Sequence, residues 1–141
     1  MKYEAPAAAD IVGSAPSSKK IAFSVEARDR GAIVLHCQGR LIFRNEANAL
    51  ARTVNEILPL ARRMVVDLAG IDAVDSAGLG ELVLLHMWAE SSGYVLKFSS
   101  AKKSVREVLE LTNLIEVLDL HASVAEAIAA MQEEATEALS S

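Results

Sequence analysis

The sequence predicts an α/β fold: one domain with a mixed β-sheet of about four or five strands and about four helices, mainly on one face of the sheet. Short segments rich in Val, Ile and Leu alternate along the chain with longer segments of helical periodicity, as in layered α/β folds. The first two strand-like segments are separated only by a turn at Asp29-Arg30-Gly31. We therefore expect them to form a hairpin, which makes the sheet mixed.

The length of the chain is sufficient for one domain with a substantial core, since it has 141 residues. We expect this domain to span residues 20–135. Residues 1–19 are rich in Ala, Pro and Ser without periodicity, which predicts a flexible N-terminal tail. Residues 136–141 are expected to form a C-terminal tail.

The first half of the domain has the pattern strand, strand, helix. Residues 21–26 alternate apolar and polar side chains, as a half-buried strand does, and residues 32–37 form a second apolar strand. After Gly39-Arg40-Leu41, a helix is expected from about Glu46, with Asn45 as its N-cap. The apolar face of this helix follows the spacing i, i+4, i+7, i+8 and comprises Leu50, Val54, Ile57 and Leu58.

The second half continues the alternation of strands and helices. Residues 64–68 are apolar almost throughout, which predicts a central strand covered on both faces. The helix after Asp75-Ser76 is expected to end before Gly93, which provides a C-terminal stop. The last helix begins with a capping box, in which Ser123 is the N-cap and Glu126 the third helical residue. The remaining predicted elements are a strand at 94–98, a helix at 102–112 with Asn113 as its left-handed C-cap, and a strand at 115–118.

Composition argues against several classes of function. Hydrophobic residues make up 52% of the chain and charged residues 23%, as in a soluble globular protein. The net charge is −5 and basic residues occur in pairs at most, so nucleic-acid binding is not expected. No apolar run reaches the roughly 18–20 residues that would span a bilayer, so membrane insertion is not expected either.

Cysteine content and the N-terminus indicate the compartment. A single cysteine, Cys37, excludes an internal disulfide and suits a reducing environment. We expect Cys37 to be a small core residue, since it lies in an apolar strand. Residues 1–6 lack the charged-then-apolar layout of a secretory signal. The expected location is cytoplasmic, and the sequence does not indicate an oligomeric state.

The stretch Asp75-Ser76-Ala77-Gly78-Leu79-Gly80 is the strongest candidate for a functional site. A strand, a glycine-containing turn and a helix place a hydroxyl and a carboxylate at a helix N-terminus, where backbone N–H groups lack partners and negative charge is favoured. Two interpretations remain open. Ser76 either caps its own helix or carries a phosphate.

Catalytic, metal and cofactor sites are not indicated. A nucleophilic Ser76 would need a base, but His86 follows it by ten residues, almost three turns down the helix. The turn also lacks the Gly-x-Ser-x-Gly pattern of a nucleophile elbow. No spacing of His, Cys and Asp residues matches a metal site. Because the Gly78/Gly80 pair lacks the Gly-Lys-Ser/Thr of a P-loop, no nucleotide cofactor is expected.

Four motifs resemble those of the STAS family of anti-sigma-factor antagonists, in the same order and spacing. They are Gly39-Arg40-Leu41, residues 65–71, residues 75–80 and residues 105–114. The similarity covers about Ile21 to Met131. It implies a single STAS-like domain that acts by binding and is not an enzyme.

The resemblance also implies a phosphorylation switch. The matching acceptor is Ser76, and Asp75, Ala77, Gly78 and Gly80 complete the switch turn. In this family the serine is phosphorylated by a partner kinase that is also the anti-sigma factor. The unmodified antagonist binds that kinase and frees the sigma factor, the phosphorylated form dissociates, and a serine phosphatase resets the switch.

One position departs from the family pattern. Many members follow the Gly-x-Leu motif with Asp, but here Gly39-Arg40-Leu41 is followed by Ile42. The alternative function is therefore a STAS scaffold that is never phosphorylated, as a subunit of a stress-signalling or lipid-transport complex.

The helix after Ser76 offers a candidate partner surface. At helical spacing, one arc faces away from Leu79, Leu82, Val83 and His86, which we expect to pack on the sheet. That outward arc would form an apolar patch beside the switch turn, suited to binding a protein; the alternative is that another helix covers it. The expected partner-binding residues are Glu81, Leu84, Leu85 and Trp88.

Overall fold

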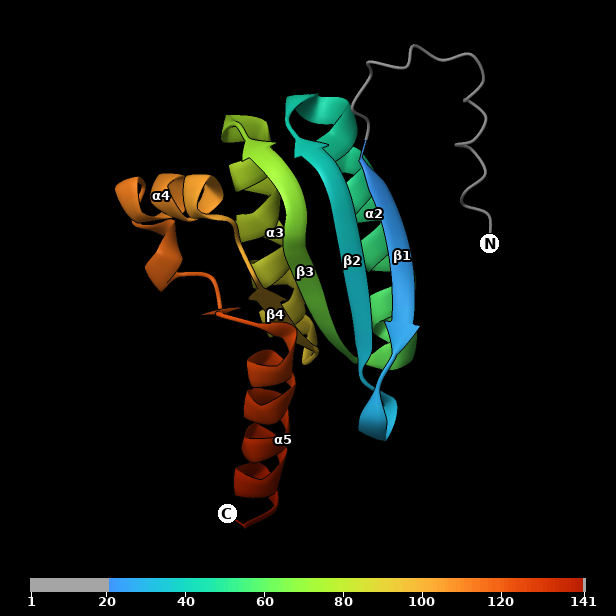
Figure 1. The fold of residues 1–141 in the computed structure, drawn as a ribbon. Helices are drawn as coiled ribbons and strands as arrows, with labels where there is room; N and C mark the ends of the chain where they lie inside the picture. Colours follow the sequence, from blue (N-terminus) through green and yellow to red (C-terminus); the bar gives the residue numbers. More distant parts are fainter. Residues whose placement is uncertain (1–20, 141) are drawn as a thin grey trace.

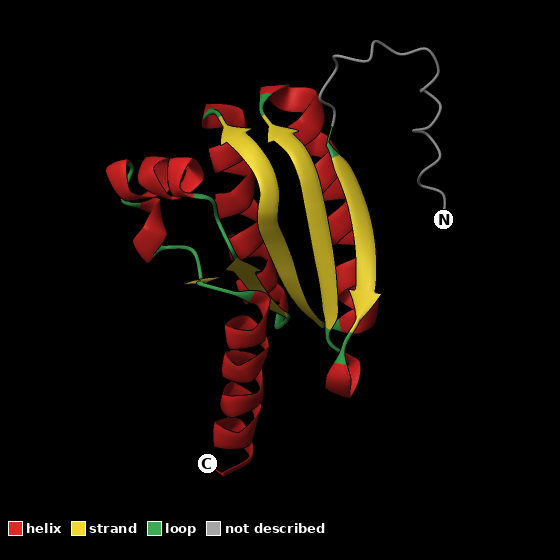
Figure 2. Ribbon diagram, in the orientation of Figure 1, coloured by secondary structure: helices red, strands yellow, loops and turns green. Residues whose placement is uncertain are grey.

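The computed structural model describes residues 21–140 and contains one five-stranded sheet and four α-helices in these residues (Figures 1 and 2). This agrees with the predicted α/β fold. The predicted N-terminal tail lies outside the described residues. In chain order the elements are β1 (Ala22–Ala27), the 3-10 helix η2 (Asp29–Gly31), β2 (Ile33–Leu41), α2 (Phe43–Ala61), β3 (Arg63–Val74), α3 (Ser76–Ser92), β4 (Val95–Ser99), α4 (Lys103–Leu111), the 3-10 helix η3 (Leu114–Glu116), β5 (Leu120–His121) and α5 (Val124–Ser140).

The sheet is mixed, as predicted. Its strand order is β1-β2-β3-β4-β5, with β1 antiparallel to β2 and all other neighbouring pairs parallel. β3 is central and much longer than the expected strand. Because the parallel strands β2 and β3 both end at the same edge of the sheet, α2 and α3 both begin there.

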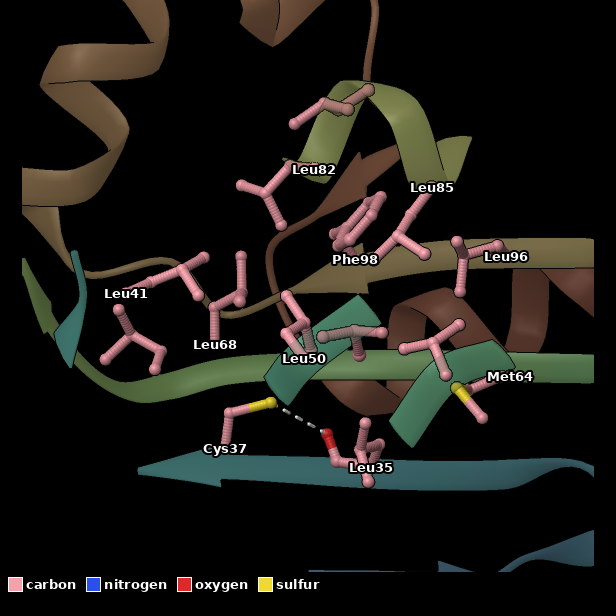
Figure 3. Close-up of a cluster of buried hydrophobic side chains, with 14 of the residues drawn as sticks. Leu35, Cys37, Leu41, Leu50, Met64, Leu68, Leu82, Leu85, Leu96 and Phe98 are labelled. Atoms are coloured by element: carbon pink, nitrogen blue, oxygen red, sulfur yellow. Dashed lines mark hydrogen bonds between the residues drawn. The ribbon is translucent and has the colours of Figure 1, made fainter. Parts of the chain in front are cut away.

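The core has two layers, one on each face of the sheet. Side chains alternate between the two faces along β2 and β3, so Leu35 and Val66 belong to the core formed with α2, α3 and α4. Figure 3 shows Leu35 in this core with Met64 of β3 and Leu82 of α3. On the opposite face, Val34 and Val65 pack with residues of α5. Cys37 is buried in the larger core as predicted, and burial raises the pKa of its thiol.

Besides the longer β3, several elements differ from the predictions. α2 begins at Phe43 rather than near Glu46. The expected strand at 115–118 is instead η3, because i→i+3 hydrogen bonds from Glu116 N–H to Asn113 O and from Val117 N–H to Leu114 O close a tight turn. Residues 136–140, for which a C-terminal tail was expected, continue α5.

A buried lysine links α5 to the sheet. Lys97 of β4 is fully buried, and its ammonium donates to Asp119 Oδ2 and Glu134 Oε2, each at 2.7 Å. Burial by itself lowers the pKa of Lys97, but the two carboxylates outweigh it and the net direction is upward. Asp119 precedes β5 and Glu134 lies on α5, so one charge joins three parts of the fold.

We expect removal of both carboxylates to be costly because it leaves a buried ammonium without a counter-charge. The double variant Asp119→Asn/Glu134→Gln should lose about 2–4 kcal/mol of unfolding free energy at neutral pH. Adding Lys97→Met should recover most of that loss, since Met fills the same space without a charge. Urea unfolding of the three proteins measures this. A triple variant no more stable than the double variant would contradict the assignment.

Candidate functional site

Ser76 is the first residue of α3, immediately after the central strand β3. The N-cap is Asp75, whose Oδ1 accepts a hydrogen bond from Gly78 N–H at 3.0 Å. Ser76 itself is exposed, and within residues 21–140 its hydroxyl has no hydrogen-bond partner. The interpretation of Ser76 as the cap is therefore wrong, because Asp75 fills that role.

Asp75 also caps a second helix. Its Oδ2 accepts a hydrogen bond from Phe43 N–H at 2.9 Å, at the start of α2. The N-cap position of α2 is Ile42, which has no side-chain acceptor, so the carboxylate of Asp75 supplies what the local sequence lacks. The backbone N–H of Asp75 donates to Leu41 O at 3.3 Å. The switch turn and the start of α2 are thus one hydrogen-bonded unit.

These bonds determine the charge of Asp75. The N–H of Phe43, and then that of Gly78, lower the pKa of the Asp75 carboxyl below its usual range. A lowered folded-state pKa means that the stabilisation is present above the unfolded-state pKa and is lost as the pH falls through the folded-state pKa. Asp75 therefore keeps its negative charge beside Ser76 throughout the neutral range.

The two glycines of the turn have different roles. A Cβ on Gly78 would lie 2.2 Å from Leu41 O and 2.9 Å from Leu41 Cγ, so only glycine fits where the turn meets the end of β2. A Cβ on Gly80 would meet nothing within 4 Å. Ala77, between Ser76 and Gly78, is half-buried. Of the two glycines, Gly78 alone is required by close packing.

The predicted partner surface on α3 needs one correction. Leu85 is only 2% exposed and belongs to the core, so its place on an exposed patch was wrong. Leu84 is exposed as predicted, Glu81 is half-buried, and Trp88 is half-buried with its ring edge-to-face against Tyr94 at 5.5 Å. The arc of α3 that faces the core consists of Gly78, Leu82, Leu85 and Ala89.

At the switch turn and along α3, the sequence analysis missed the exposed apolar residues Phe43 and Met87. Phe43, at the start of α2, is 64% exposed and is held beside the switch turn by its bond to Asp75. Met87 on α3 is 57% exposed, close to the value of 59% for Leu84. The apolar surface on α3 thus centres on Leu84 and Met87.

The helix geometry does not favour a hydrolase. Ser76 and His86 lie on one continuous helix, about 15 Å apart along its axis. Within residues 21–140, no cluster of three or more His, Cys, Asp and Glu side chains could hold a metal ion. None of the helices described is both long and apolar enough to cross a membrane.

Comparison with known proteins identifies related sequences and structures. The family model of the STAS domain matches residues 24–127. An anti-sigma factor antagonist of Mycobacterium paratuberculosis is 24% identical with a TM-score of 0.67, covering 84% of this chain and 98% of its own. SpoIIAA, an anti-sigma factor antagonist from Bacillus, has been solved in unphosphorylated and phosphorylated forms. Both forms are 17% identical to this chain, with TM-scores of 0.64 and 0.58; they cover 79% and 78% of it, and 97% and 99% of their own chains.

The same fold occurs as part of a much larger protein. The murine anion transporter Slc26a9 is 13% identical with a TM-score of 0.66, and the match covers 82% of this chain but 22% of the transporter. At these identities the structural likeness shows the fold alone.

The contrast between the two glycines can be tested directly. Gly78→Ala should destabilise the protein by about 2 kcal/mol or more, because the methyl group must separate the turn from β2. Gly80→Ala, two residues further along the same helix, should be neutral or stabilising by up to about 1 kcal/mol. Thermal unfolding of both variants measures the difference, and equal effects would show that the contact with Leu41 is unimportant.

Proposed function

The chain belongs to the STAS domain family, and from this we propose that it is an anti-sigma-factor antagonist in a bacterial partner-switching pathway. Unmodified, it binds an anti-sigma factor that is also a serine kinase, in the cytoplasm. Phosphorylation of Ser76 causes the complex to dissociate, and a serine phosphatase restores the unmodified form. The chain acts by binding, and the covalent chemistry belongs to its partners.

The observation that carries this proposal is the position of Ser76. Its hydroxyl is exposed at the first residue of α3, while Asp75 performs the capping. A kinase can therefore modify the hydroxyl without removing a bond that the fold needs.

The local charges explain how a phosphate would act as a switch. Phosphorylation adds roughly −1.5 to −2 charges beside the ionised carboxylate of Asp75. The N-terminus of α3 tolerates this charge within the domain, because its dipole and unpaired N–H groups favour anions. A partner surface that faces the turn with negative charge would be repelled. Binding thus changes while the fold is retained.

The proposed docking surface extends from the switch turn along α3. It comprises Glu81, Leu84, Met87 and Trp88, with Phe43 at the start of α2. Burial raises the pKa of Glu81, and contact with a partner would bury it further. Apolar side chains at the centre and charged groups at the edge are typical of a protein interface.

The scaffold function is the second candidate, and one observation favours it. Ile42 stands where many family members carry Asp, and the adjacent Phe43 is exposed while its backbone N–H is bonded to Asp75 of the switch turn. Such an apolar contact would bind a partner whether or not Ser76 carries a phosphate.

Phosphorylation should distinguish the two candidates. We expect the cognate kinase and ATP to add one phosphate, which mass spectrometry maps to Ser76. Ser76→Ala should fold with a stability within about 0.5 kcal/mol of wild type, since the hydroxyl makes no bond within residues 21–140, and should bind the kinase permanently. Ser76→Asp should bind weakly because it mimics part of the added charge. Equal affinity of all three forms would favour the scaffold.

Substitutions at adjacent positions of α3 should separate binding from stability. Leu84→Ala should lower partner affinity roughly tenfold with an unchanged melting temperature, since Leu84 is exposed. Leu85→Ala is the matched control and should cost about 2–5 kcal/mol of unfolding free energy through a core cavity. Calorimetry of binding and of unfolding measures both. Unchanged affinity in Leu84→Ala would remove this surface from the proposal.

A further inference from the structure

The face of the sheet opposite α2 and α3 carries a row of polar residues. The strand registers place Ser24 beside His36, His36 beside Asp67, Asp67 beside Ser99, and Ser99 beside His121. Figure 1 shows α5 over one end of this face and no helix in front of the upper parts of β1 and β2. The side chain of His36 is 35% exposed there.

His36 lies between carboxylates of two other strands. Its Nδ1 is 2.6 Å from Asp67 Oδ2 on β3, and its Nε2 is 2.7 Å from Glu26 Oε1 on β1. An ionised carboxylate only accepts hydrogen bonds, and a neutral imidazole has one N–H. Both contacts are hydrogen bonds only when the imidazole carries protons on both nitrogens. The geometry therefore fits an imidazolium.

The surroundings support a positive charge on His36. Asp67 Oδ1 accepts a hydrogen bond from Ala69 N–H at 3.0 Å, which orients that carboxylate. Arg28 lies 3.8 Å from the other oxygen of Glu26. Elsewhere on this face, Lys97 pairs with Asp119 and Glu134, His121 Nε2 lies 2.8 Å from Asp119 Oδ1, and Arg63, which shares the face of Asp67 on β3, donates a hydrogen bond to the backbone oxygen of Arg30.

Strand β1 has few other attachments to the rest of the fold. It is an edge strand, hydrogen-bonded only to β2, and five of its six residues are exposed. Phe23 is its partly buried contact with the core. Across the described part of the chain, the hydrogen bond that His36 Nε2–H donates to Glu26 is the side-chain hydrogen bond that joins β1 to another strand.

We propose that His36 is a proton-dependent clasp for the edge of the sheet: doubly protonated, it joins Glu26 of β1 to Asp67 of β3 across β2, and loss of a proton loosens β1. This device lies on the face opposite the α2/α3 layer and is independent of the phosphorylation of Ser76. It makes the attachment of one strand respond to pH without a change in the core.

The direction of the response follows from the two carboxylates. The hydrogen bond to Glu26 raises the pKa of His36 most, burial opposes it, and Asp67 adds to the rise, so the net direction is above the usual value. A raised folded-state pKa means that the stabilisation is complete below the unfolded-state pKa of about 6.5 and is lost as the pH rises through the folded-state value. β1 is fastened in mildly acidic conditions and loosened in alkaline ones.

Nuclear magnetic resonance of the full chain tests the clasp. We expect His36 to titrate above about 6.5, with both nitrogens protonated at lower pH. Amide protection in β1 relative to β3, corrected for intrinsic exchange, should fall roughly three- to tenfold as His36 loses its proton. Glu26→Gln, which keeps the size of the side chain, should lower the pKa of His36 and reduce the protection of β1 at low pH.

Two variants complete the test. His36→Gln should make the relative protection of β1 independent of pH. His121→Gln is the control, because it removes a histidine bonded to a carboxylate in the same row but away from β1, and it should retain the wild-type response. A His36 that titrates at or below about 6.5, or a β1 response that persists in His36→Gln, would overturn the proposal.

Discussion

One carboxylate accepts hydrogen bonds from backbone N–H groups at the start of two helices. The arrangement of the switch turn and of the start of α2 depends on it. Asp75 accepts hydrogen bonds from Gly78 N–H in α3 and Phe43 N–H in α2. Since β2 and β3 are parallel, both helices begin at the same edge of the sheet and their unpaired N–H groups lie close together. A single anion at that point fixes the turn, the second helix and the exposure of Ser76.

Features encoded by neighbouring residues could be predicted from the sequence. Gly93 ends α3 in the left-handed conformation, Asn113 adopts the same conformation after α4, and Ser123 accepts the hydrogen bond of Glu126 N–H at 3.1 Å. The alternation of strands and helices likewise gave the fold class and placed Ser76 at the start of α3. In each case the physical cause lies within a few residues of its effect.

Features with distant causes could not be predicted in this way. The start of α2 was misplaced because its capping carboxylate lies 32 positions further along the chain. Leu85 was assigned to the surface because α3 carries apolar residues around most of its circumference, so periodicity alone does not identify the buried arc. The contacts of His36 were missed because they join three strands, although Val65 and Asp67 were expected on one strand and alternation places both on the same face.

Asp75 caps α3 and Ser76 does not, and this difference determines which position tolerates substitution. The side chain of Asp75 makes the hydrogen bonds that hold the turn, whereas the side chain of Ser76 makes no hydrogen bond within the described residues. Another small residue could therefore replace serine at that position with little effect on folding. Neighbouring positions such as Gly78, which are fixed by packing, do not have this freedom.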